Sequence, residues 1–120
     1  MRGFICLAFL GSIIAMPAMA QSACVAPDTP AGIDGASVTL DELKAAIGAV
    51  KNFIARSDDY QDCLGKEVQA SKSASDASKP DPDIAKRNQA LADANQKAKE
   101  SVGASVNAAI AAYKKAHPAR

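Results

Sequence analysis

The sequence predicts an all-α protein: an antiparallel two-helix hairpin with an extended N-terminal segment that is disulfide-linked to the first helix. Three observations support this fold class. Two stretches with helical spacing of apolar residues each run for about 34 residues. A polar, proline-bearing stretch separates them. Two cysteines, Cys24 and Cys63, follow the N-terminal apolar run, and an even pair is typical of a bridge.

Residues 1–20 have the layout of a secretory signal peptide. Arg2 precedes a run of mostly apolar residues, and the small-x-small triplet at 18–20 supplies a cleavage site. A membrane-spanning helix is the alternative, but the apolar run is shorter than the roughly 20 residues that a bilayer core requires. We therefore expect cleavage after Ala20, a periplasmic or secreted product, and no stable membrane insertion after cleavage.

Charge and composition limit the partners of the exported product. The whole chain has 14 basic and 13 acidic side chains, and the loss of Arg2 with the signal leaves no net charge. Such a balance predicts no nucleic-acid partner. Residues 83–120 hold an excess of basic side chains, which could favour an anionic surface or simply solubilise a helix. Much of the 48% hydrophobic content is alanine or belongs to the signal, so the core should be thin.

Cys24 and Cys63 are the two cysteines that follow the signal. In an oxidising compartment such a pair is first interpreted as a disulfide, which should stabilise the fold by roughly 4 kcal/mol. An acylated Cys24 is the alternative, but Gln21, three positions earlier, is not leucine-like. The helix rises about 36 Å between Thr39 and Cys63, whereas the segment from Cys24 to Thr39 spans at most about 50 Å. The bridge therefore requires residues 21–38 to run nearly straight and antiparallel to the first helix.

The first helix is predicted over about 40–73. Thr39 and Glu42 form a capping box at its start, and the polar stretch after Lys72 ends it. One apolar stripe runs along the helix at spacings of three and four, with polar gaps at Ser57 and Gln61: Leu40, Leu43, Ile47, Val50, Ile54, Leu64 and Val68. We expect the extended segment to cover a second row, made of Ala46, Phe53 and Tyr60. Its own apolar residues would lie along the helix surface: Val25, Ile33 and Val38.

The second helix is predicted over about 82–116, which gives a helical hairpin at 39–117 and a tail at 118–120. Asp81 suits the N-cap, Pro82 suits the first helical position, and Pro118 stops the helix. Matched helix lengths favour antiparallel packing about a short connection. Folding the chain about residue 77 brings together Leu64 with Leu91, Gln61 with Asn95, Ser57 with Ala98, Ile54 with Val102, and Ile47 with Ala108.

Two features of this hairpin allow alternative interpretations. Gln61, Asn88 and Asn95 either fix the register of the seam or face water at its edge. Large residues near the open end either pack within the hairpin or form a surface for a homodimer. These residues are Leu40, Leu43, Val106, Ile110 and Tyr113.

The sequence points away from catalysis. Its single histidine, His117, stands near the C-terminus, where no neighbouring cysteine or carboxylate can complete a metal shell. The two cysteines lack the close spacing of redox motifs. An acidic group offers too few oxygens for calcium, so we expect a charged solvent face at Asp58, Asp59, Asp62 and Glu67. We therefore expect no enzyme activity, no catalytic, cofactor-binding or metal-binding residues, and no cofactor.

Residues 24–64 contain a Cys-x-x-Pro-x-x-Pro start at Cys24, an Asp34-Gly35 pair and the pattern Tyr60-x-x-Cys63-Leu64. In this pattern the chain resembles small exported proteins of unknown function from Gram-negative bacteria. The resemblance implies a periplasmic location and a helical fold with the bridge. It carries over no activity and no catalytic residue.

The expected function is that of a non-enzymatic periplasmic helical protein, acting as an interaction or structural module of the cell envelope. Its partner would be an unknown envelope protein or a second copy of this chain in a homodimer. The alternative is a holdase-like chaperone or inhibitor, which would bind exported client proteins through apolar surface exposed when the hairpin opens.

Overall fold

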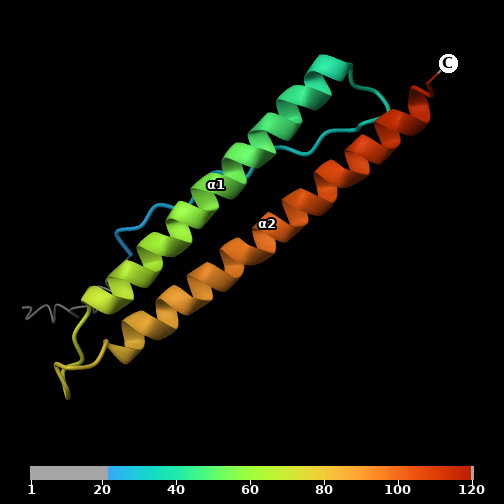
Figure 1. Ribbon diagram of the computed structural model, residues 1–120. Helices are drawn as coiled ribbons and strands as arrows, with labels where there is room; N and C mark the ends of the chain where they lie inside the picture. Colours follow the sequence, from blue (N-terminus) through green and yellow to red (C-terminus); the bar gives the residue numbers. More distant parts are fainter. Residues whose placement is uncertain (1–21, 120) are drawn as a thin grey trace, which may run out of the picture.

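The computed structural model describes residues 22–119 as two long antiparallel helices and an extended N-terminal arm, defined here as residues 22–38 (Figure 1). Helix α1 spans Leu40–Ala70 and helix α2 spans Pro82–Ala116. The residues that the structure describes form no strand. The predicted all-α hairpin with a disulfide-linked arm is confirmed, whereas the expected signal peptide lies outside the described residues.

Helix α1 begins at the predicted capping box. The Thr39 hydroxyl accepts a hydrogen bond from the Glu42 amide at 3.3 Å, and the Thr39 amide donates to the Glu42 carboxylate at 2.7 Å. The Thr39 hydroxyl also donates to this carboxylate at 2.9 Å, and the two bonds that the carboxylate accepts, the one from the backbone amide foremost, hold the pKa of Glu42 below its ordinary value. The helix ends at Ala70 rather than near residue 73, because Ser71 is extended and its hydroxyl donates to the Val68 carbonyl at 2.6 Å.

Helix α2 has the predicted bounds. The Asp81 carboxylate accepts hydrogen bonds from the amides of Asp83 at 2.9 Å and Ile84 at 3.2 Å, and Pro82 occupies the first turn. The Asp81 amide in turn donates to the Ser71 hydroxyl at 3.0 Å. One serine therefore ends α1 and fixes the start of α2, which sets the length of the connection between them.

The seam between the helices repeats every seven residues. The buried positions at this spacing are Leu43, Val50, Ser57 and Leu64 on α1, and Asn88, Asn95, Val102 and Ala109 on α2. A seven-residue repeat keeps the same face of each helix against its partner. Near the middle of the hairpin, Val50, Phe53 and Val102 form an apolar cluster, against which Ile54 packs. Ile54 and Val102, which are predicted to lie close together, thus belong to the same packed group.

At the open end of the hairpin most of the large side chains are covered. Leu43 is buried, while Val106, Ile110 and Tyr113 are half-buried. Leu40 remains 48% exposed. Four of the five residues that could have formed a separate surface therefore lose much of their exposure within the single chain.

Asparagine side chains occupy the seam itself. Asn95 Nδ2 donates to Ser57 Oγ at 3.2 Å, and Gln61 Nε2 donates to Asn95 Oδ1 at 2.9 Å, which confirms the predicted pairing. Asn88 Nδ2 donates to the Leu64 carbonyl at 3.0 Å. Asn88 and Asn95 are only 2% and 8% exposed. They lie within the seam rather than at its solvent-exposed edge. A change of register between the helices would therefore break their hydrogen bonds.

The arm runs along α1 and then passes between the helices toward the C-terminal half of α2 (Figure 1). Between Cys24 and Ile33 its burial follows a period of three, because Pro27 is buried and Cys24, Pro30 and Ile33 are half-buried while the residues between them are exposed. Three residues per turn is the repeat of a polyproline helix. The expectation for Val25 is wrong: it is out of phase with this repeat and 82% exposed.

Gly35 brings the arm against the backbone of α2. A Cβ atom built on Gly35 would lie 1.8 Å from the carbonyl oxygen of Ala109, so only glycine allows this approach. At Gly32 the nearest atom to such a Cβ is Ser105 Oγ, at 3.5 Å, which is an ordinary contact. The arm was expected to cover α1, and it also packs on α2, making it a third element of the core.

Alanine at these two glycines should have opposite effects. Gly35→Ala should lower the free energy of unfolding by about 1–3 kcal/mol, because the arm must move away from α2. Gly32→Ala should raise it by about 0.5 kcal/mol, because it restricts the unfolded chain without a clash. Urea unfolding followed by far-UV circular dichroism measures both, and equal stabilities would contradict the close packing of Gly35.

Removal of the seam amide should also destabilise the hairpin. Asn95→Ala should cost about 1–3 kcal/mol, because the buried Ser57 hydroxyl loses its partner. The double variant Ser57→Ala/Asn95→Leu should recover most of this loss, since both polar groups are gone. Asn107→Ala, the same change on the exposed side of α2, is the matched control and should stay within about 0.5 kcal/mol of wild type. Thermal and urea unfolding of the four proteins would show whether Asn95 is dispensable.

Candidate functional site

The bridge between Cys24 and Cys63 fixes the start of the arm to α1. The two Cα atoms are 5.8 Å apart, within the usual range for a disulfide. Both cysteines are half-buried. The predicted pairing is confirmed, and the nearly straight, antiparallel path that it required is the path the arm takes (Figure 1).

A single carboxylate beside the bridge joins all three elements. Glu67 of α1 accepts hydrogen bonds from the Ser22 hydroxyl at 2.7 Å and the Ala23 amide at 3.3 Å, both in the arm. From α2, Asn88 Nδ2 donates to Glu67 at 2.7 Å, and Arg87 forms an ion pair with it at 3.2 Å. We call these five residues the Glu67 cluster. It holds the arm on the hairpin through a second, non-covalent contact.

The electrostatics of this cluster favour the charged form of Glu67. Hydrogen bonds from Ser22, Asn88 and Ala23, together with the positive charge of Arg87, hold the pKa of Glu67 below its ordinary value. Partial burial opposes this effect. The side chains of Glu67 and Arg87 keep 25% and 28% of their exposure. Water therefore screens the ion pair, so the directed hydrogen bonds contribute most of the specificity of the Glu67 cluster.

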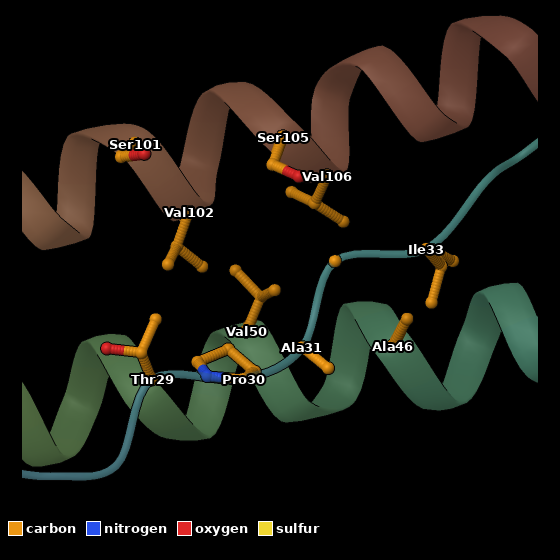
Figure 2. Close-up of a pocket in the computed structure, with 11 residues that line it drawn as sticks. Thr29, Pro30, Ala31, Ile33, Ala46, Val50, Ser101, Val102, Ser105 and Val106 are labelled. Atoms are coloured by element: carbon orange, nitrogen blue, oxygen red, sulfur yellow. The ribbon is translucent and has the colours of Figure 1, made fainter.

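A small cavity lies farther along the arm, where it passes between the helices (Figure 2). Its volume is about 210 Å³, and Val50 of α1 faces Val102 and Val106 of α2 across it. Pro30 and Ile33 belong to the arm side of the lining. The lining side chains are aliphatic or hydroxylated, and none of them is ionisable. This arrangement offers apolar contact rather than acid–base chemistry.

The acidic residues do not stay together as the sequence suggested. Asp58 pairs with Lys99 of α2, and Asp59 and Asp62 are exposed. The prediction that Glu67 faces solvent is wrong, because its carboxylate is turned to the arm and α2. Within residues 22–119, no three His, Cys, Asp or Glu side chains gather as a metal site would need.

One signal could have revealed the role of Glu67. Glu67 follows Cys63 by four residues, so the two share a helix face. A cysteine bridged to the arm must face the arm, and its neighbour on that face must do so as well. The contribution of Arg87 and Asn88 carried no such signal, since it depends on how α2 is placed against α1.

His117 remains at the end of α2, as expected from the sequence. Its ring stacks on Tyr113 with centroids 4.3 Å apart, and its Nδ1 lies 3.1 Å from the Tyr113 carbonyl oxygen. The side chain is exposed. Its contacts are those of a residue that completes the last helical turn.

The Glu67 cluster predicts a pH dependence of stability. A carboxylate with a lowered folded-state pKa stabilises the fold above its unfolded pKa, and this contribution is lost as the pH falls through the folded-state pKa. Between about pH 5 and about pH 2, Glu67→Gln should therefore lose less Tm than the wild type. Asp59→Asn, outside the cluster, is the control and should keep the wild-type profile. Parallel melting curves of Glu67→Gln and wild type would contradict the role of the cluster.

Two findings concern the chain as a whole. Across residues 22–119, neither helix contains an apolar stretch long enough to cross a membrane. No protein-family model matches the chain, and neither does any curated protein or solved structure. Because no relative indicates functional residues, we define the candidate site by the contacts of the arm with the two helices.

Proposed function

We propose that the protein is a non-enzymatic, periplasmic interaction or structural module of the cell envelope. The observation that carries this proposal is the use made of the polar groups. The Glu67 cluster joins arm, α1 and α2, and Asn95 joins the helices through Ser57 and Gln61. Groups of this kind are occupied in holding a shape, which is what a recognition surface requires.

The exported location rests on three supports. Residues 1–20 have the charge, apolar run and small-x-small triplet of a signal peptide. The Cys24–Cys63 bridge suits an oxidising compartment. The pattern within residues 24–64 resembles that of small exported proteins from Gram-negative bacteria.

The recognition role follows from the junction of the three elements. The arm and the two helices meet at an aliphatic cavity whose lining carries no ionisable group. The partner is an envelope protein or a second copy of this chain. The holdase alternative requires the hairpin to open, because the large hydrophobic residues exposed in the described chain are Val25 and Leu40.

Photocrosslinking in intact cells tests the proposed role. A photoreactive amino acid would replace Ala55 on α1, or Ala94 or Ser105 on α2, all of which are exposed. At least one position should give a discrete adduct with an envelope protein or with a second copy. Ala77, in the exposed connection between the helices, is the control position.

The outcome that contradicts the proposal combines two measurements. One is the absence of any adduct at Ala55, Ala94 and Ser105 above the level seen at Ala77. The other is a strict monomer in light scattering of the processed protein. Together they would leave no partner and no self-association for an interaction module.

A further inference from the structure

The groove between α1 and α2 is occupied by a segment of the protein's own arm. Residues 29–33 line the cavity together with side chains from both helices (Figure 2). We propose that this groove is a binding site for an extended, proline-containing segment of another exported protein, and that residues 29–35 occupy it in the absence of that partner. The inference rests on the proposed role as an interaction module and specifies the surface and the partner.

The resident segment shows which chemistry the groove accepts. Pro30 and Ile33 are its covered positions, and they continue the three-residue spacing that Cys24 and Pro27 begin earlier in the arm. Proline favours this extended three-residue repeat before binding, so little conformational entropy is lost when such a segment docks. Gly35 then allows the backbone to approach Ala109. The fitting ligand is thus an extended segment with Pro-x-x-aliphatic spacing, followed by glycine two residues later.

The arm fills the groove incompletely. A cavity of about 210 Å³ remains beside Val50, Val102 and Val106. Gly32 contributes no side chain at this point, and a Cβ there would make only an ordinary contact with Ser105 Oγ at 3.5 Å. A partner segment with a branched aliphatic residue at the place of Gly32 would bury apolar surface that the arm leaves uncovered. Such a segment would bind more tightly than the arm does.

The middle of the arm can leave without breaking hydrogen bonds to the helices. At the bridge end, Ser22 and Ala23 bond to Glu67, and at the other end Asp34 bonds to Ala36 and Ser37. Within the described chain, no hydrogen bond joins residues 25–33 to α1 or α2. Apolar packing alone holds this stretch, so local opening requires less free energy than unfolding of a helix.

The occupant is another protein rather than the arm of a second copy. Each arm is bound at one end to Cys63 of its own α1 and continues at the other end into the capping box at Thr39. Both ends stay attached when the middle lifts, which prevents the arm from reaching across to a second groove. An exchange between copies would require the bridge to break first.

A labelled peptide tests the proposal on the full processed protein. The peptide carries residues 26–37 with Gly32→Leu, and its binding is measured by fluorescence anisotropy. The host variant Ile33→Ser weakens the hold of the arm, because Ile33 is covered by the groove. The matched control host is Val25→Ser, an aliphatic-to-serine change at a position that is 82% exposed.

The expected result is a set of ratios. The leucine peptide should bind the Ile33→Ser host about tenfold more tightly than it binds the wild-type host. This ratio is expected because the arm that competes with the peptide has lost the apolar contact of Ile33. The Val25→Ser host should bind as wild type does. A peptide that also carries Gly35→Ala should lose binding to every host, because its Cβ would meet the Ala109 backbone.

A second measurement tests the proposal even if the host variant Ile33→Ser does not fold. In wild-type protein, addition of the leucine peptide should shift the NMR signals of the Val102 and Val106 methyl groups. If these signals do not move and Ile33→Ser binds no better than Val25→Ser, the groove is not an exchange site. If photocrosslinks arise from Ala55 or Ala94 and never from Ser105, the interaction role stands and the groove proposal falls.

Discussion

The attachment of the arm is the constraint on which the rest of the structure depends. Helix α2 places two asparagines at its seam, and among the described residues its buried apolar side chains are Val102 and Ala109. Two helices with so little apolar area gain little by packing on each other alone. The arm adds a third element, and the Cys24–Cys63 bridge keeps it beside the helices at a high effective concentration.

The asparagines of the seam bury less apolar surface than leucine would, but they fix the register of α1 against α2. Asn88 and Asn95 occupy positions where leucine would bury more surface, but leucine would pack almost equally well one heptad away. The amides bond to particular partners, the Leu64 carbonyl and the Ser57 hydroxyl. The hairpin thus accepts a thinner core in return for a single register, and the arm contributes part of the missing apolar contact.

Local signals were enough to predict the two helices and the pairing of Gln61 with Asn95, whereas Ser57 and Leu64 bond to Asn95 and Asn88 rather than to the predicted neighbours Ala98 and Leu91. The caps at Thr39 and Asp81 depend on side chains within three residues, so the sequence marks both helix starts correctly. The register between Gln61 and Asn95 followed from matched lengths about one connection. The sequence places the end of α1 near residue 73 rather than at Ala70, because Ser71 caps the helix through contacts that also involve Asp81.

Features that join three elements were not predictable in the same way. Arg87 and Asn88 reach Glu67 only because α2 lies at one rotation against α1. The approach of Gly35 to Ala109 likewise depends on where the arm crosses α2. The wrong expectation for Val25 could have been avoided, because the spacing from Cys24 through Pro27 and Pro30 to Ile33 already indicates a repeat of three residues, with which Val25 is out of phase.

The position of the bridge also determines how the chain would carry mechanical tension. A pull on the two chain ends enters α1 at Cys63 through the sulfur atoms, because the covalent path through the bridge is the shortest. Residues 25–62 then form a closed loop that transmits no force. Stretching would act on the part of α1 that follows Cys63 and on α2, and it would load the polar seam next to the connection, while the part of α1 that precedes Cys63 carries no load.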